Sequence, residues 1–215
     1  MSSLGPLIER NRAWASRIEA TQPGFFRSLA AQQAPRYLWI GCADSRVPAN
    51  EIVDLAPGEL FVHRNVANVV VHTDFNCLSV LQYAVDVLKV EHVIVVGHYG
   101  CGGIRAALEG TPLGLIDNWL RHVQDVASKH RALLERLPSA GERLSRLCEL
   151  NVVEQVVHVA RTTIVQDAWR RGQRVTLHGF VYGLHNGLLN DLSIEADGVA
   201  ALEASYTRSL AALGG

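Results

Sequence analysis

Two short clusters of reactive side chains stand out in this chain: Cys42-Ala43-Asp44-Ser45-Arg46 and His98-Tyr99-Gly100-Cys101-Gly102-Gly103. Each cluster follows a short apolar run, residues 37–40 and 93–96, of the kind that forms a buried strand. Ligands bind at the carboxyl ends of parallel strands in an open α/β sheet, so two thiols, an imidazole and a carboxylate would converge there. Because these groups are ligands of tetrahedral zinc, the sequence predicts a metal site.

The pairing of His98 with Cys101 is a weak signal by itself, because buried cysteines and hydrogen-bonded core histidines are common. Glycines around the pair permit tight turns, and Cys42 ends its strand where a second thiolate is needed. Cys77 and Cys148 lie inside helical patterns, so we expect them to be buried core residues. The remaining histidines lack a cysteine at ligand spacing, and we expect them at the surface or hydrogen-bonded in the core.

The overall composition narrows the possible functions. Lysine and arginine (20) nearly balance aspartate and glutamate (21), which argues against a nucleic-acid partner and against a polybasic contact with a membrane. No stretch approaches the roughly 20 apolar residues of a membrane span, and the first residues lack the pattern of a signal peptide. Four cysteines in 215 residues do not suggest a disulfide framework, so we expect a reducing, cytoplasmic setting. No linker or repeat divides the chain, which predicts a single domain over residues 1–215.

The elements that must position these groups are typical of an α/β fold. Apolar runs predict strands at residues 38–42, 59–63, 93–96, 174–182 and 188–194. Asn186-Gly187 predicts a tight hairpin between the last two, so the central sheet should be mostly parallel with an antiparallel edge strand. Flanking helices are expected at residues 77–89 and 115–137, followed by one that opens with a capping box at Asn151 and Glu154 and stops at 170–172.

Two helical segments point to an assembly of several copies. Residues 1–30 predict an N-terminal helical arm, which we expect to pack on a partner. Residues 77–89 carry apolar side chains on two faces, and a helix that is apolar on most sides is buried on most sides. In a chain of this size the second face is expected to meet another subunit, which predicts a homodimer or homotetramer.

Residues 38–48 and 97–103 resemble the two signature motifs of the β-class carbonic anhydrases, and the resemblance continues through residues 58–68 and 73–89. It covers nearly the whole chain. It implies one zinc ion per chain, held by Cys42, His98 and Cys101, with Asp44 as an exchangeable fourth ligand. It also implies reversible hydration of carbon dioxide to bicarbonate and a proton, through attack of a zinc-bound hydroxide on the substrate carbon.

Asp44 and Arg46 are the expected catalytic pair. Two thiolates and one imidazole leave a zinc centre less positive than three imidazoles do, so it stabilises hydroxide less. The Asp44 carboxylate can compensate by accepting a hydrogen bond from the bound water, and Arg46 can hold that carboxylate in an acceptor-only state. A plain salt bridge between the two residues is compatible with this role, but it would not explain their position beside a ligand cysteine.

The resemblance also implies a substrate site. Its parts are a glutamine that hydrogen-bonds the substrate anion, a backbone N–H donor and an apolar wall, namely Gln33, Gly102, Val66, Tyr83 and Val87. Tyr83 and Val87 lie on the helix that is expected at a subunit interface. One subunit would therefore complete the pocket of the other.

Trp39, Arg64 and Tyr182 match a trio that marks a bacterial subgroup regulated by bicarbonate at a non-catalytic pocket. Each residue alone is more simply a core indole, a salt-bridging arginine or a strand tyrosine. Together, a guanidinium, an indole N–H and a phenol can hold a small oxyanion, which implies allosteric inhibition by bicarbonate. The chain departs from the subgroup pattern at Gly183, where an acidic residue is expected, a difference that concerns the last hairpin and leaves the zinc site untouched.

Three other functions are compatible with parts of this pattern. A thiol redox protein that used Cys42 and Cys101 would be expected to carry a Cys-x-x-Cys motif, which the chain lacks. A zinc-stabilised binding module would not need Asp44 and Arg46, nor so large an apolar core. A family member with an altered substrate, for example one that hydrolyses carbon disulfide, stays open because the same zinc hydroxide could serve it.

Overall fold

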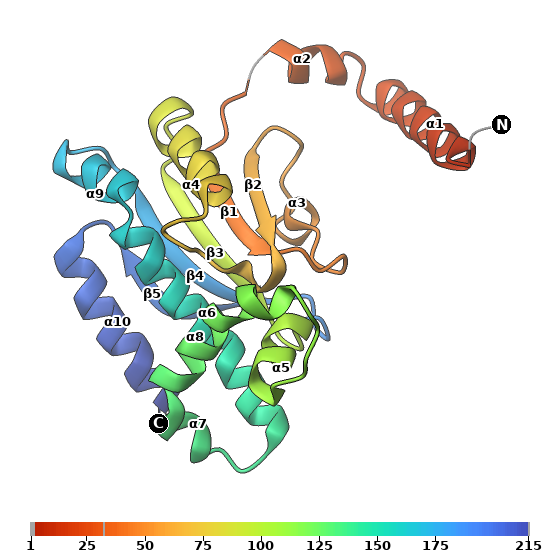
Figure 1. Cartoon of the computed structure of the whole chain (residues 1–215). Coiled ribbons are helices and arrows are strands. Elements are labelled where there is room, and N and C mark those ends of the chain that lie inside the picture. Colours follow the sequence, from red (N-terminus) through yellow and green to blue (C-terminus); the bar gives the residue numbers. More distant parts are fainter. Residues whose placement is uncertain (1–2, 32, 215) are drawn as a thin grey trace. The chain divides into compact units, whose positions relative to one another are not determined.

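The computed structural model describes residues 3–31 and 33–214 in two compact units, Met1–Ala34 and Pro35–Gly215. The first unit holds helices α1 (Gly5–Thr21) and α2 (Phe25–Ala31), in agreement with the expected helical arm (Figure 1). Although the Trp14 and Phe26 rings meet edge to face at 5.5 Å, no described residue of either helix is buried. Helices depend on tertiary packing for most of their stability. A partner for this arm, and its membership of one domain over residues 1–215, stay predictions.

The second unit is built on a five-stranded sheet with the order β2-β1-β3-β4-β5. Its strands are β1 (Tyr37–Cys42), β2 (Leu60–Asn65), β3 (His92–His98), β4 (Thr176–Tyr182) and β5 (Leu189–Ala196). The first four are parallel, and β5 runs antiparallel to β4 along the edge. The hairpin turns at Gly187, whose φ of +71° favours glycine. The predicted α/β fold, with a mostly parallel sheet and an antiparallel edge strand, is confirmed.

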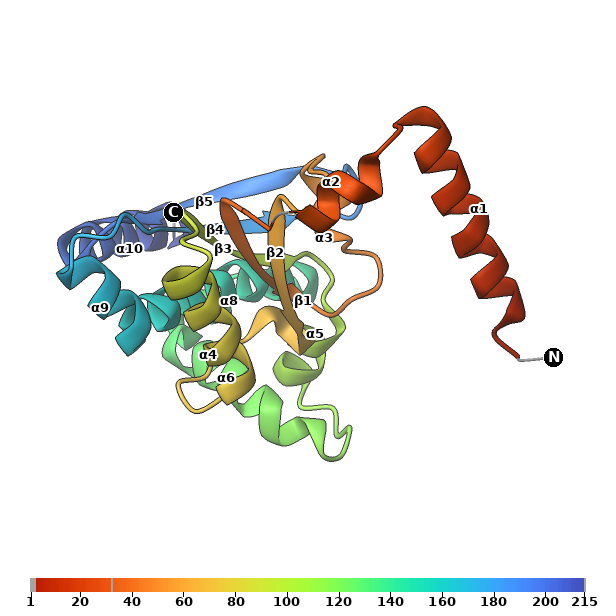
Figure 2. The same ribbon diagram turned by 90° about the horizontal axis from the view of Figure 1, so that it is seen from above.

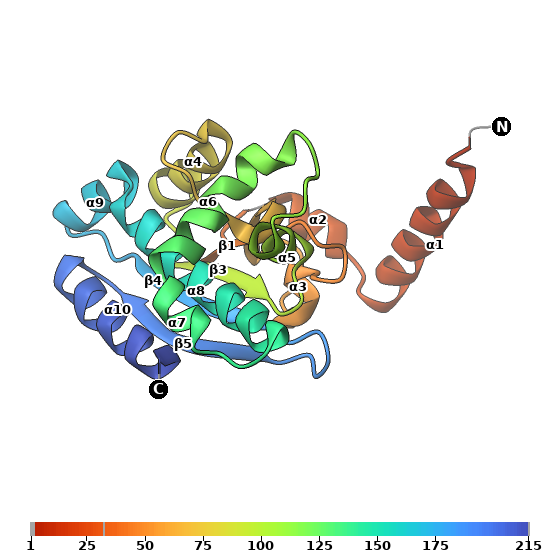
Figure 3. The ribbon, with the colours of Figure 1, turned by 60° about the horizontal axis from the view of Figure 1, so that its bottom comes forward.

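Helices flank this sheet (Figure 2). They are α3 (Ala49–Ile52), α4 (Phe75–Gln82), α5 (Gly102–Glu109), α6 (Ile116–Lys129), α7 (Arg131–Glu135), α8 (Ala140–Arg161), α9 (Thr163–Arg170) and α10 (Val199–Gly214). A 3₁₀ turn, η1 (Val66–Asn68), follows β2, and a π-helical turn, η2 (Tyr83–Val87), continues α4. Helix α8 packs along β3 and β4, and α10 packs against β5. Helices α5 and α6 lie toward the carboxyl ends of the strands, where the site forms (Figure 3).

The strand residues alternate between apolar clusters on the two faces of the sheet. Leu38 and Ile40 enter the largest cluster, on the side of α8, whereas Trp39 enters a second cluster on the opposite side. A third cluster, around α5, α6 and α8, contains Cys42 and Cys101. Strands covered on both faces are typical of parallel sheets and explain the unbroken apolar runs in the sequence. The strand ends that carry the predicted zinc donors are therefore fixed in the core.

Helix α8 begins earlier than the sequence predicted. Its N-cap is Ser139, whose hydroxyl accepts from the Glu142 N–H while the Glu142 carboxylate accepts from the Ser139 N–H. Asn151 lies in the helix interior, fully buried, and its amide donates to the Ala67 carbonyl at 2.9 Å. The predicted cap at Asn151 is therefore wrong, because a tertiary hydrogen bond, and not a helix start, explains this polar residue.

Other helix boundaries also differ from the prediction. The single helix expected after the second cluster is two helices, because the chain leaves helical geometry at His130, whose Nε2 lies 2.7 Å from the buried Glu154 carboxylate. Lys129 and Tyr206 donate to the same carboxylate at 2.7 Å, which ties α6, α8 and α10 together. Helix α8 stops at Thr162, whose hydroxyl caps α9. The sequence pattern had given no prediction for α10.

Candidate metal centre

Two strand ends and one helix start bring the three predicted zinc donors together. Cys42 is the last residue of β1, His98 is the last residue of β3, and Cys101 is the N-cap of α5. Strands β1 and β3 are hydrogen-bonded neighbours. Gly100, at φ +71°, makes the turn that returns the chain from His98 to Cys101. All three donors are buried, with exposed fractions between 1% and 4%.

The distances suit a tetrahedral zinc ion. The Cys42 and Cys101 sulfurs are 3.8 Å apart, and two thiolates at a Zn–S length of about 2.3 Å and a tetrahedral angle would be about 3.8 Å apart. The three ligand atoms lie within 4.8 Å of one another. Among the described residues the buried His98 Nε2 has no hydrogen-bond partner, while its Nδ1 lies 3.2 Å from the Tyr99 carbonyl. Since a carbonyl only accepts, Nδ1 carries the hydrogen and the Nε2 lone pair is free for a metal.

The two thiols differ in acidity. The hydrogen bond with Cys101 lowers the pKa of the Cys42 thiol well below its usual range, against the opposing effect of burial. The pKa of Cys101 is raised, because its proton is held in the bond to Cys42 and because the group is buried. A divalent cation bound to both sulfurs would displace the proton that they share.

Asp44 lies two residues beyond Cys42 and is clamped by Arg46. The Arg46 Nε and Nη2 donate to Oδ1 and Oδ2 of Asp44 at 2.9 and 2.7 Å, and the Arg46 backbone N–H donates to Oδ1 at 2.9 Å. These bonds hold the pKa of Asp44 well below its usual range. The Oδ2 also lies 3.7 Å from the His98 Nε2, so the carboxylate borders the point where the donors meet.

Arg64 supports the same loop from β2. Its Nε donates to the Cys42 carbonyl at 2.9 Å, and its Nη2 donates to the Asp44 carbonyl. The sequence interpretation assigns Arg64 to a bicarbonate pocket, whereas the structure shows that it also fixes the backbone of a ligand residue. Such contacts to metal-binding loops commonly orient the ligands. A change at Arg64 would therefore reach the metal centre as well as any bound anion.

One wall of the centre is the strained turn η1. Ala67 and Asn68 have φ values of +63° and +47°, a region that costs free energy for residues other than glycine. The turn is held from α8, where the buried Asn151 amide donates to the Ala67 carbonyl. It brings Val66 against Gly103, where an added Cβ would lie 2.9 Å from the Val66 Cγ1. The structure therefore places Val66 beside the start of α5, as an apolar wall of the site requires.

The other predicted substrate residues lie in different environments. Gly102 is the first residue of α5, so its N–H is one of those without a partner inside the helix. Tyr83 and Val87, on η2, are 46% and 59% exposed, and one copy of the chain encloses neither side chain. Gln33 is exposed in the N-terminal unit. Contacts of these residues with substrate stay predictions.

Two of the predicted bicarbonate residues share an apolar cluster. Trp39 is fully buried there and Tyr182 packs against it, while the Trp39 Nε1 has no hydrogen-bond partner among the described residues. A buried N–H without a partner costs free energy. Gly183 is explained by the hairpin, because a Cβ at this position would collide with the Asn186 side-chain oxygen.

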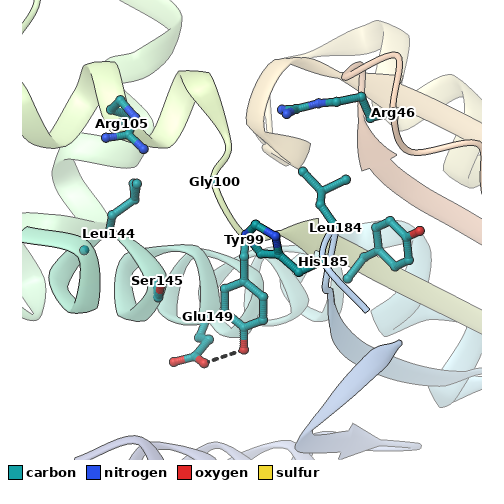
Figure 4. Close-up of a pocket in the computed structure, with 11 residues that line it drawn as sticks. Arg46, Tyr99, Gly100, Arg105, Leu144, Ser145, Glu149, Leu184 and His185 are labelled. Atoms are coloured by element: carbon teal, nitrogen blue, oxygen red, sulfur yellow. Dashed lines mark hydrogen bonds between the residues drawn. The ribbon is translucent and has the colours of Figure 1, made fainter. Parts of the chain in front are cut away.

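A groove of about 1030 Å³ runs past the Asp44 clamp and the ligand turn (Figure 4). It is lined by Arg46, Tyr99, Gly100, Arg105, Gly141, Leu144, Ser145, Glu149, Tyr182, Leu184 and His185. The Tyr99 hydroxyl donates to the Glu149 carboxylate across it at 2.7 Å. Sequence reasoning missed both residues. The position of Tyr99 between His98 and Cys101 was the one feature of the sequence that could have indicated a role at the site. No feature of the sequence pointed to Glu149.

A second group of potential ligands is formed by His63, Asp74 and Cys77, whose donor atoms lie within 4.8 Å of one another. The sequence pattern did not predict this proximity for His63. Burial raises the pKa of Cys77 to about 12 and lowers the pKa of His63. Asp74 already caps α4 by accepting from the Asn76 N–H. Because a protonated thiol and an engaged carboxylate are poor ligands, Cys77 is best described as the buried core residue that the sequence predicted.

Comparisons with known proteins agree with this geometry. The family model for carbonic anhydrase matches residues 37–189. A carbonic anhydrase of Emericella nidulans is 49% identical over 195 residues, which are 91% of this chain and 86% of the relative. The structure of a Coccomyxa β-carbonic anhydrase in complex with acetazolamide has a TM-score of 0.90 at 43% identity, covering 95% of this chain and 92% of that one. The structure of one of two tetrameric β-carbonic anhydrases from Sordaria macrospora has a TM-score of 0.85 at 36% identity, covering 90% of this chain and 98% of that one.

With its donors at two parallel strand ends and this likeness over nearly the whole chain, the protein belongs to the β-class carbonic anhydrase family. It is a carbonic anhydrase, an enzyme that interconverts carbon dioxide and bicarbonate. The family predicted from the two motifs is thereby confirmed. None of the described helices has the length and apolar character to cross a membrane.

Proposed function

We propose that this carbonic anhydrase works with one zinc ion per chain, held by Cys42, His98 and Cys101. The observation that carries the proposal is the buried sulfur pair, 3.8 Å apart, beside a His98 Nε2 that lacks another partner among the described residues. When bound there, zinc supplies Lewis acidity, which lets a water ligand act as a nucleophile near neutral pH. The chain's own residues must orient that water, exclude competing solvent and bind the product.

Asp44 is the proposed orienting acceptor. Its Oδ2 lies 3.7 Å from the His98 Nε2, and Arg46 engages both carboxylate oxygens, so the group stays ionised and can only accept. A fixed acceptor turns one O–H of the reacting water toward itself and the oxygen lone pair toward the substrate. If the carboxylate turns away from Arg46, it reaches toward the donors, which makes Asp44 the proposed exchangeable fourth ligand.

The substrate would lie between an apolar wall and a few hydrogen-bond donors. Val66 supplies the wall seen in one copy, and the Gly102 N–H supplies a donor at the start of α5. We assign Gln33, Tyr83 and Val87 to the same pocket within an assembly of two or four copies. The exposure of Tyr83 and Val87 supports that assembly, because large apolar surfaces left exposed commonly mark an interface.

Inhibition by bicarbonate at Trp39, Arg64 and Tyr182 is the regulatory part of the proposal. The unpaired Trp39 N–H supports an anion there, and Arg64 links that pocket to the carbonyls on either side of Ala43. A ligand shifts an equilibrium through its different affinities for two states, so bicarbonate would favour the state in which Arg64 leaves this loop. Membership of the bicarbonate-regulated bacterial subgroup depends on this property.

The cleanest test of the regulatory proposal is Trp39→Phe, because it removes the N–H and keeps an aromatic ring. We expect weaker inhibition by bicarbonate at pH 7 to 9 with zinc content unchanged, and the same weakening for Arg64→Ala. Since Arg64 also fixes the metal loop, that variant is expected to lose basal rate in addition. Identical bicarbonate responses in Trp39→Phe and the parent would refute the regulatory assignment.

Two further assignments complete the proposal. We place residues 1–215 in a single carbonic anhydrase domain, in which residues 1–30 form a helical arm that serves assembly. We place the protein in the cytoplasm, because its four cysteines are all free thiols, as expected in a reducing compartment.

The zinc assignment is tested by comparing two cysteine variants. Cys42→Ser is expected to lose zinc and hydration activity, whereas Cys77→Ala, which removes an equally buried thiol outside the centre, is expected to keep one zinc per chain. Zinc is measured by elemental analysis and activity by stopped-flow hydration of carbon dioxide. Full activity without zinc, or full zinc content in Cys42→Ser, would contradict the proposal.

A further inference from the structure

The turn between two of the proposed zinc ligands contains only two residues, Tyr99 and Gly100. Gly100 has no side chain and a left-handed φ of +71°, so it contributes freedom and no anchor. Tyr99 is therefore the one residue of this turn whose side chain can fix it to the rest of the fold. We propose that Tyr99, held by Glu149, is a positioning residue that sets the orientation of His98 toward the metal, an inference that rests on the proposed zinc centre.

The contact between Tyr99 and His98 decides which ring nitrogen can bind a metal. The Tyr99 carbonyl lies 3.2 Å from the His98 Nδ1 and can only accept, so it requires the hydrogen on Nδ1. The Nε2 lone pair is then left facing the two sulfurs. An outer partner on the second nitrogen commonly orients a histidine ligand and raises its basicity. The position of the Tyr99 carbonyl therefore fixes both the tautomer and the tilt of the ring.

Three hydrogen bonds hold Tyr99 in place. The Tyr99 N–H donates to the Tyr182 carbonyl at 3.0 Å, which extends the β3–β4 pairing by one residue. The carbonyl itself is bound by His98, and the hydroxyl donates to the Glu149 Oε1 at 2.7 Å (Figure 4). The first bond fixes the turn to the sheet and the last fixes it to α8. With its N–H and its hydroxyl both bound, Tyr99 cannot shift without breaking a hydrogen bond, and rotation of its carbonyl would break the bond to His98.

Glu149 is itself held in place and cannot follow a moving turn. Its second oxygen lies 3.1 Å from the Arg146 Nε, one turn earlier on α8, and the Arg146 Nη1 donates to the Leu213 carbonyl at the end of α10. The Glu149 side chain is 15% exposed, so its charge is only partly hydrated and depends on these partners. The turn between His98 and Cys101 is therefore connected through Tyr99 to α8 and α10, two helices that carry none of the proposed zinc ligands.

A matched tyrosine on α10, Tyr206, binds a second glutamate of α8. The Tyr206 hydroxyl donates to the Glu154 Oε1, also at 2.7 Å, and Glu154 likewise has a cationic second partner in Lys129. This pair resembles the Tyr99–Glu149 pair in chemistry and burial, but neither residue adjoins a proposed ligand. Loss of either hydroxyl should lower the free energy of unfolding by a similar amount, because each removes one hydrogen bond to a carboxylate. Only the loss at Tyr99 should change metal binding.

The experiment compares Tyr99→Phe, Glu149→Ala, the double variant and Tyr206→Phe in the full chain loaded with zinc. Zinc transfer to a competing colorimetric chelator gives the affinity, and the absorption of the Co²⁺-substituted protein reports ligand geometry. We expect Tyr99→Phe and Glu149→Ala each to weaken zinc binding about 10-fold, within the range for outer-sphere partners, with no further loss in the double variant. Tyr206→Phe should keep the parental affinity and Co²⁺ spectrum.

The result that overturns the inference is a zinc affinity in Tyr99→Phe within twofold of Tyr206→Phe, with an unchanged Co²⁺ spectrum. Independent, additive losses in the double variant would also overturn it, because they would show that the two residues do not act together. If one single variant does not fold, the other carries the comparison. Failure of the zinc centre itself would appear separately, as a parent protein that holds no zinc.

Discussion

Asp44→Asn is the smallest substitution that tests the proposed mechanism, because it replaces one carboxylate oxygen by an amide nitrogen. The carboxylate accepts three N–H groups from Arg46, at 2.7 to 2.9 Å, with both of its oxygens in use. An amide of the same shape keeps one oxygen acceptor and turns the other position into a donor. Whichever way it is placed, at least one Arg46 N–H then faces an N–H, and the oxygen near the His98 Nε2 loses its charge.

The size of the effect follows from the bonds lost. A hydrogen bond between charged partners contributes about 1.5 to 3 kcal/mol, so loss of one such bond from the transition state slows the reaction about 10- to 150-fold. Loss of a positioned acid–base partner gives a similar range, about 10² to 10⁴-fold. We therefore expect the Asp44→Asn variant to hydrate carbon dioxide at least about 10²-fold more slowly, with its zinc content unchanged.

The assay is stopped-flow hydration with zinc per chain measured on the same preparation. Glu91→Gln is the matched control, because Glu91 also accepts from an arginine, Arg36, through its Nε and Nη2 at 3.1 and 2.7 Å, but lies at the other end of the strands. That control is expected to keep the parental rate. If Asp44→Asn retains full zinc and a rate within about threefold of the control, Asp44 is a structural partner of Arg46 and the mechanism is refuted.

Three further outcomes are expected. Hydrogen bonds outweigh burial and lower the pKa of Glu154 to about 2, so the stabilisation that its carboxylate gives is complete above the unfolded pKa near 4.5 and is lost as the pH falls toward 2. Between these pH values, urea unfolding should show that acid lowers the free energy of unfolding by about 2 kcal/mol less in Glu154→Gln than in the parent, after allowance for screening by solvent. Equal pH dependence in the two proteins would contradict this. Gly103→Ala should cost about 1 to 3 kcal/mol in thermal unfolding, because its Cβ would lie 2.9 Å from a core methyl, whereas Gly198→Ala meets no atom within 4 Å and should be neutral. Val87→Glu should dissociate the assembly in sedimentation, whereas Leu115→Glu, at a more exposed apolar residue outside the proposed interface, should not; an active monomer of the parent would refute the shared pocket.

The sheet could be predicted because its signals are local. Buried strands leave unbroken apolar runs, and Asn186-Gly187 specifies its own turn. Polar residues inside helices were harder, since Asn is a good helix cap by type and its tertiary partner is invisible in the sequence. Asn151 was therefore assigned to a helix start, although it is a buried donor to Ala67.

The site was predictable to the extent that two short motifs carry it. Cys42, His98 and Cys101 come from two short segments at strand ends, and the structure brings their donor atoms together. The contacts that orient them come from distant elements, such as Arg64 on β2 and Glu149 on α8. Local sequence gives no register between such elements, so these partners appear only in three dimensions.

The order of the strands has a consequence for folding kinetics. Cys42 and Cys101 are 59 residues apart in the chain, and their sulfurs meet only after β1 and β3 have paired as parallel neighbours through a long crossover. Such non-local pairings form late in folding, because the entropy cost of closing the loop comes before the favourable contacts between the strands. An ion that needs both sulfurs then finds its site only in the nearly native chain. It should leave the refolding rate almost unchanged and act by slowing unfolding, so a chelator would shorten the lifetime of the folded protein without hindering its formation.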